Sequence, residues 1–152
     1  MEFPLFEEVA DLVRTMVPSE LGQVRTRSHR RGVKLWFDTD KPGREHYEAQ
    51  LLSRRHVDGA DGTAVEIGFH SEHSDEARNT EVVAALARAE SSWRNELGIS
   101  AELAPFLGAA NWRRLSECWI EPDVDDPELA FELAARLVDY VTVLEPLRTD
   151  QV

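Results

Sequence analysis

The chain has 152 residues, a formal net charge of −12, 42 % hydrophobic residues and one cysteine, which fits a single globular domain. A chain of this length buries enough surface to fold without a disulfide or a bound metal, and the lone Cys118 cannot form an internal bridge. No apolar run approaches the roughly 18 residues of a membrane span, and no export signal is apparent at the amino terminus. We therefore expect a cytoplasmic protein that does not enter a membrane.

The acidity is concentrated in the second part of the chain. Residues 1–57 carry ten Lys or Arg and nine Asp or Glu, whereas residues 58–152 carry seven and twenty. A field of this sign repels phosphate backbones, and duplex binding relies on several basic residues that neutralise phosphates. We therefore do not expect this chain to bind nucleic acid.

The first predicted element is a helix with apolar side chains every three or four residues, which Pro18 ends. Its apolar stripe consists of Leu5, Phe6, Val9, Leu12, Val13 and Met16. Such a stripe is typical of a helix that packs on a core.

Between about Gln23 and Phe69 the apolar period changes to two, which predicts half-buried antiparallel strands. Glycine-containing turns separate the alternating runs at residues 29–32, 40–43 and 58–62. The apolar positions on one face are Val33, Leu35, Phe37, Tyr47, Ala49, Leu51, Val65, Ile67 and Phe69. Consecutive hairpins of this kind predict a meander of about four strands.

Helical spacing returns after this meander. Residues 74–98 predict a helix that Ser74 or Asn79 could cap, and residues 100–107 predict a short helix. Residues 112–120 read as one later strand, with apolar side chains on both of its faces.

Asp126 precedes a proline and a glutamate, a sequence typical of a helix start, and we expect Pro146 to end this last helix. The predicted fold class is α+β: an antiparallel meander of about four strands plus one later strand, packed by amino-terminal, middle and carboxy-terminal helices. We expect one domain over residues 1–146 and a loose tail over residues 147–152.

The familiar short motifs of catalysis and cofactor binding do not occur in the sequence. It has no glycine-rich dinucleotide or phosphate loop, no His-Glu-x-x-His pair and no nucleophile elbow. Asp38-Thr39-Asp40 starts like a calcium loop, but Pro42 and Ala49 occupy positions that such a loop needs for ligands.

Strand register predicts a cluster that no motif shows. If Leu35 faces Ala49, Asp38 lies opposite His46, and a second hairpin that pairs Tyr47 with Phe69 sets His46 opposite His70. Opposed side chains lie about 5 Å apart at Cβ, close enough for two imidazoles and a carboxylate to share one divalent ion. Asp38, His46 and His70 are therefore candidate metal ligands.

Glu48 lies beside that row and could act as a general base if burial raised its pKa. Trp36 would form one wall, and Gly68 would leave room beside it. The alternative interpretation is that a solvated sheet face simply carries ordinary polar residues. A register shifted by two residues would also keep every face and break the row.

Two other surfaces are candidates for binding. Trp36 interrupts the polar face, and tryptophan is enriched at interfaces, so this face could contact a ligand or partner through the residues Trp36, Glu48, Gln50 and Glu66. A basic stretch could hold an anion through Arg25, Arg27, Arg30 and Arg31, or could be a solvated hairpin.

Two functions therefore compete. The first is a non-enzymatic acidic binding or adaptor domain without a cofactor, which contacts a protein partner or forms a homodimer through the sheet face or helices. The alternative is a metal-dependent hydrolase or small-ligand enzyme, with a divalent ion on Asp38, His46 and His70 and with Glu48 as base. The first predicts that the three ligands do not converge, and the second predicts a cleft beside them.

Overall fold

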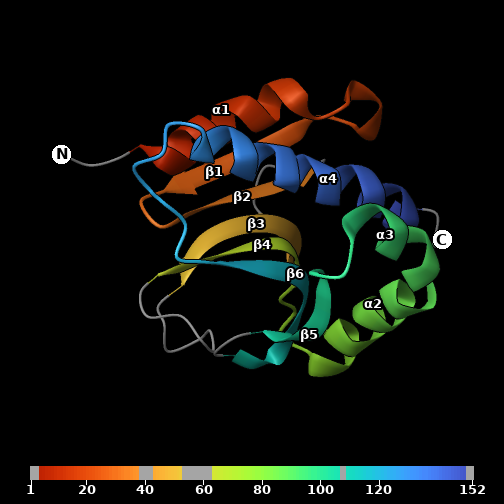
Figure 1. Cartoon of the computed structure of the whole chain (residues 1–152). Helices are drawn as coiled ribbons and strands as arrows, with labels where there is room; N and C mark the ends of the chain where they lie inside the picture. Colours follow the sequence, from red (N-terminus) through yellow and green to blue (C-terminus); the bar gives the residue numbers. More distant parts are fainter. Residues whose placement is uncertain (1–3, 38–42, 53–62, 107–108, 150–152) are drawn as a thin grey trace.

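A computed structural model describes residues 4–37, 43–52, 63–106 and 109–149 (Figure 1). Its elements are α1 (Leu5–Met16), the 3-10 turn η1 (Ser19–Leu21), β1 (Val24–His29), β2 (Gly32–Phe37), β3 (Glu45–Leu52), β4 (Ala64–Ser71), α2 (Glu76–Arg88), α3 (Glu90–Leu97), β5 (Glu102–Phe106), β6 (Ala109–Ile120) and α4 (Leu129–Thr149). Within these ranges no helix has both the length and the apolar character of a membrane crossing.

The strands form one antiparallel sheet in the order β1-β2-β3-β4-β6-β5. The first four strands are the expected meander, and β6 is the expected later strand, placed next to β4. The predicted α+β class, with helices from the beginning, middle and end of the chain, is confirmed.

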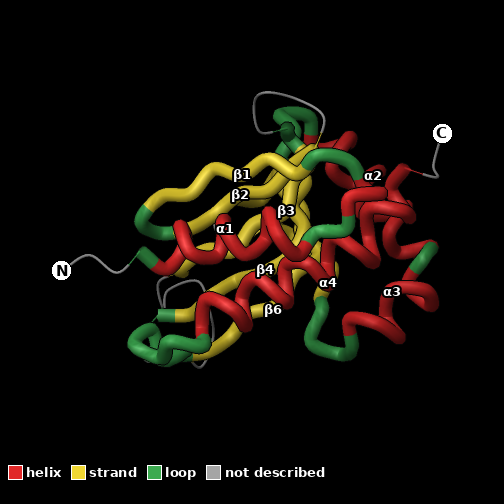
Figure 2. Tube along the Cα trace, turned by 90° about the horizontal axis from the view of Figure 1, so that it is seen from above, coloured by secondary structure: helices red, strands yellow, loops and turns green. Residues whose placement is uncertain are grey.

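The apolar core lies between the sheet and the helices that cover one of its faces. α1 and α4 lie side by side over the strands, and α3 packs against α4 (Figures 1 and 2). Leu35, Tyr47 and Ile67 point into this core and are at most 1 % exposed. The alternation read from the sequence therefore assigns these side chains to the correct face.

The opposite face of the sheet is polar and is nevertheless buried. His46, Glu48, Glu66, His70 and Ser116 are all 5 % exposed or less. This differs from the expected solvated face. Buried polar groups need hydrogen-bond partners, so the contacts of these five side chains indicate what the face does.

Gly68 sits at the centre of this face, where β4 and β6 approach closely. A Cβ atom built on Gly68 would lie 2.4 Å from the carbonyl oxygen of Leu115 and 2.5 Å from the Cα of Ser116. The glycine therefore makes room for a neighbouring strand rather than for a ligand beside Trp36.

The short helix expected over residues 100–107 is wrong. Glu102–Phe106 forms the edge strand β5, which pairs with β6 through Leu103 and Leu115. Pro105 is tolerated because an edge strand does not need every backbone N–H for pairing.

The single helix expected over residues 74–98 is divided at Ala89 into α2 and α3. The N-cap of α2 is Asp75, whose carboxylate accepts a hydrogen bond from the Ala77 N–H at 3.0 Å. The prediction that Ser74 or Asn79 caps this helix is therefore wrong. Asn79 is fully buried and bonds instead to Ser71, to His73 and to the Asn111 carbonyl.

α4 begins after Asp126, whose carboxylate accepts from the Glu128 N–H, as expected for a capping residue. The expected end at Pro146 is wrong, because the helix continues to Thr149. Arg148 anchors this last turn through ion pairs with Glu45 and Glu145. The expected tail therefore does not begin at residue 147, and residues 150–152 lie outside the described ranges.

Candidate metal centre

The register of β3 and β4 places two histidines side by side. His46 pairs with His70, as the sequence predicts, and their ring centroids are 5.5 Å apart. β2 and β3 pair two residues away from the expected register, because Leu35 faces Tyr47 instead of Ala49. The predicted pairing of Asp38 with His46 therefore rests on a wrong register, and Asp38 itself lies outside the described residues.

Two glutamates complete the cluster in place of Asp38. Each of the four residues offers one ligand atom, and these atoms all lie within 4.8 Å of one another. The contacts between them join His46 Nε2, Glu48 Oε1, His70 Nδ1 and Glu72 Oε2. We call these four residues the His2Glu2 cluster. His46 Nε2 lies 3.0 Å from Glu48 and 3.7 Å from Glu72, and His70 Nδ1 lies 3.3 Å and 3.2 Å from the same two oxygens.

These spacings match the edges of a metal coordination shell. Metal–ligand bonds of about 2.0–2.1 Å at tetrahedral angles separate neighbouring donors by about 3.3–3.4 Å. The four His-to-Glu distances scatter around that value, and imidazole nitrogen with carboxylate oxygen is an ordinary donor set for a divalent transition metal.

Both imidazoles are also held from behind. His46 Nδ1 lies 2.9 Å from the Gly43 carbonyl oxygen, and His70 Nε2 lies 2.6 Å from Glu66 Oε2. A carbonyl and a carboxylate only accept, so each of these ring nitrogens donates its proton. This arrangement directs the second nitrogen of each ring towards the centre of the cluster, as in the outer shell of known metal sites.

The charges of the cluster depend on one another. Burial raises the pKa of Glu48, but hydrogen bonds and charge from His46 and His70 outweigh it and lower that pKa to about 2. Burial lowers the pKa of His70, but the charge of Glu66 and its carboxylate hydrogen bonds raise it well above the usual value. Burial raises the pKa of Glu66, yet the charge and hydrogen bond of His70 leave it lowered. Glu48 and Glu66 are thus ionised.

The shift of Glu48 is opposite to the one that a general base would need. Its carboxylate stays ionised and contacts both imidazoles, so Glu48 belongs with the candidate ligands. The general-base hypothesis of the sequence analysis has no support in this geometry.

A hydrogen-bonded chain leads from the cluster across the polar face. Glu66 accepts from the Gln50 amide at 2.9 Å and from the Ser116 hydroxyl. Arg114 donates to the Ser116 hydroxyl at 2.8 Å and pairs with Glu102, which is largely exposed. Side chains of β3, β4 and β6 are therefore joined in one hydrogen-bonded network.

The residues proposed to contact a partner lie together on the polar face of the sheet, but they are not exposed. Trp36, Glu48 and Glu66 are buried within the chain, and Gln50 is half-buried through its bond to Glu66. A pocket of about 350 Å³ opens beside Trp36 and His46, at the start of β3. Glu48, His70 and Glu72 do not line this pocket.

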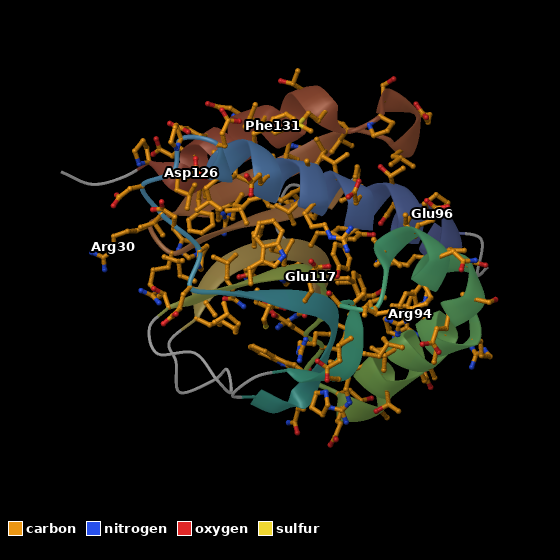
Figure 3. The ribbon with its side chains drawn as sticks, viewed as in Figure 1. Arg30, Arg94, Glu96, Glu117, Asp126 and Phe131 are labelled. Atoms are coloured by element: carbon orange, nitrogen blue, oxygen red, sulfur yellow. The ribbon has the colours of Figure 1, made fainter. Side chains whose placement is uncertain are left out.

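The four arginines proposed for anion binding have different surroundings. Arg25 and Arg27 lie on β1, opposite Trp36 and Lys34 of β2. Arg30 lies in the β1–β2 turn and points away from the body of the molecule (Figure 3). Arg31 donates to the Leu51 carbonyl oxygen. These contacts are those of a hairpin, and anion binding there stays a prediction.

Glu72 is the ligand that register reasoning did not assign. It follows β4 and lies two residues beyond His70, so continued alternation past the strand end puts it on the same face. The signal was therefore present in the sequence, but strand periodicity alone does not say how far the strand geometry continues.

Comparisons of the chain with protein-family models, with curated proteins and with solved structures found no match.

Proposed function

We propose that the protein binds one divalent transition-metal ion at His46, Glu48, His70 and Glu72. The observation that carries this proposal is the convergence of four donor atoms at coordination-shell spacing, inside a buried face where each imidazole is held from behind.

The donor set favours zinc, iron(II), manganese or cobalt. Two imidazole nitrogens disfavour calcium and magnesium, which prefer oxygen ligands, and the absence of sulfur from the cluster disfavours copper(I). Cys118 of β6 is paired with Glu66 of β4 and does not lie next to the histidines. Burial raises the pKa of its thiol, so it stays protonated.

The ion would join β3 to β4 and to the segment after β4. His46, Glu48 and His70 are at most 6 % exposed, whereas the Glu72 side chain is 13 % exposed. A closed shell of four protein ligands is typical of an ion that stabilises a fold. Hydrolysis would require an open coordination position, and Glu72 is the ligand whose departure could provide one.

The competing adaptor hypothesis proposes contact through the sheet face or through the helices, and the first of these routes needs an accessible sheet face. Trp36, Glu48 and Glu66 are covered within the single chain, so this face favours metal binding over docking. Contact with a protein partner or a second copy through the helices stays a prediction.

Isothermal titration with Zn²⁺ tests the proposal. We expect one ion per chain for the native protein and a loss of binding in His70→Ala. The matched control is His73→Ala, because His73 bonds to Glu45 and lies outside the cluster. Absence of a stoichiometric site in the native protein, or equal binding by His70→Ala, would contradict the proposal.

A further inference from the structure

Glu66 is a buried carboxylate that faces the metal cluster without belonging to it. It lies on β4, four residues before His70 and on the same face, and is 1 % exposed. Its Oε2 atom is 2.6 Å from His70 Nε2, which is the ring nitrogen on the far side from the cluster centre. Glu66 is therefore placed to act on the ion through His70.

The remaining contacts of Glu66 fix its orientation. The Gln50 amide donates to Oε1 at 2.9 Å, and the Ser116 hydroxyl also bonds to the carboxylate. Ser116 is itself held by Arg114. Side chains from β3 and β6 thus hold the carboxylate against the imidazole from both sides.

We infer that Glu66 is a positioning residue for the metal ion, in a carboxylate–histidine–metal arrangement with His70. Its carboxylate accepts the Nε2 proton, which keeps the Nδ1 lone pair of His70 directed at the ion. A negative acceptor at this distance also makes the imidazole a stronger donor. This inference rests on the proposed metal site and adds a residue that controls its affinity.

Glu66→Gln keeps the size of the side chain but changes its hydrogen-bonding capacity. An amide has one accepting oxygen and one donating NH2 group, so it cannot accept from both the Gln50 amide and His70 through separate oxygens. Loss of an outer-shell partner costs about 10–100-fold in metal affinity. We expect a loss in that range for Zn²⁺.

The swap variant Glu66→Gln with Gln50→Glu separates charge from simple hydrogen bonding. In this double variant the carboxylate at position 50 accepts from the amide NH2 group at position 66. The amide oxygen at position 66 accepts from His70. The net charge of the face is unchanged. We expect the swap to recover the thermal stability of the metal-free protein and to retain the weakened Zn²⁺ affinity. A purely structural role predicts that both recover together.

The experiment measures Zn²⁺ affinity by competition titration, the absorption bands of the Co²⁺ form, and thermal unfolding without metal. Glu117→Gln is the control, because Glu117 is a buried carboxylate on the opposite face. We expect shifted Co²⁺ bands in both Glu66 variants and native bands in the control. Native Zn²⁺ affinity in either the single or the swap variant would overturn the inference, whereas a native protein that binds no Zn²⁺ would overturn the metal site itself.

Discussion

At the scale of single residues, the candidate metal site lies where burial and polarity coincide. His70 is fully buried and has a carboxylate at each ring nitrogen, with Glu66 on one side and Glu48 and Glu72 on the other. Desolvating such groups is unfavourable unless every polar atom is satisfied. In the structure these groups pair with one another, and a divalent ion at the centre would take the place of those pairs.

The two glutamates of the cluster differ in burial, and we expect their substitutions to differ in effect. Glu48 contacts both imidazoles within 3.3 Å, whereas Glu72 is the most exposed ligand. We predict that Glu48→Gln weakens Zn²⁺ binding at least about 100-fold, more than loss of an outer-shell group, and that Glu72→Gln weakens it about tenfold. Titration of the two variants checks the order, and a larger effect of Glu72→Gln would contradict it.

Position 68 has room for glycine but not for a residue with a Cβ atom. An added methyl group would overlap the backbone of β6 at Leu115 and Ser116, and the φ angle of +155° is one that other residues rarely adopt. We predict that Gly68→Ala lowers the free energy of unfolding by about 1–3 kcal/mol. Urea unfolding measures the change, with the exposed Gly43→Ala as control. An unchanged midpoint of urea unfolding would contradict this prediction, because β4 and β6 would then move apart without loss of stability.

At the scale of elements, the helices are fixed to the sheet by buried polar contacts as well as by apolar packing. Glu117 of β6 points towards α4 and accepts from Arg136 at 2.7 Å and from Tyr140 at 2.8 Å (Figure 3). Trp119 donates to its second oxygen, and Arg136 also reaches the Leu97 carbonyl of α3. One carboxylate therefore joins β6 to α4 and, through Arg136, to α3.

This carboxylate predicts part of the acid sensitivity of the fold. Burial raises the pKa of Glu117, but hydrogen bonds from Arg136, Trp119 and Tyr140 outweigh it and leave the pKa lowered. Its contribution to stability is therefore present above the unfolded-state value of about 4.3 and is lost as the pH falls through the folded-state pKa.

We predict that Glu117→Gln lowers the free energy of unfolding by about 2–3 kcal/mol at pH 7 and by less at pH 3. Urea unfolding at the two pH values measures this difference. Equal destabilisation at both would show that charge on Glu117 is unimportant.

The elements also show what could be predicted from the sequence. Apolar alternation identified the faces of β2, β3 and β4, because a slip of a single residue would expose the core. The choice of Tyr47 opposite Phe69 gave the observed pairing of His46 with His70. The same alternation is unchanged by a slip of two residues, so it could not fix the register of β2 against β3. β5 was missed because five residues around Pro105 carry little periodic signal.

At the scale of the whole molecule, the sheet separates an apolar interior under α1 and α4 from a polar interior on its other face. Figures 1 and 2 show the two helices lying over the sheet. Alternation reports that a face is polar and does not report whether solvent reaches it. For this reason the sequence indicated the residue types of the cluster but not its burial.

A bound ion should stabilise the entire fold, because the native state presents the assembled site and the unfolded chain does not. At a free Zn²⁺ concentration 100 times Kd, binding adds about 2.7 kcal/mol. For a chain of this size we predict a rise in Tm of about 5–10 °C. Thermal unfolding with and without Zn²⁺ measures it, with His70→Ala expected to show no rise, and an equal rise in both proteins would place the ion elsewhere.

Anomalous X-ray diffraction from crystals of the native protein grown with Zn²⁺ tests the central claim most directly. The account predicts one strong anomalous peak about 2.0–2.2 Å from His46 Nε2, Glu48 Oε1, His70 Nδ1 and Glu72 Oε2. A map with zinc bound only at surface side chains, and with the four donors still bonded to one another, would contradict it.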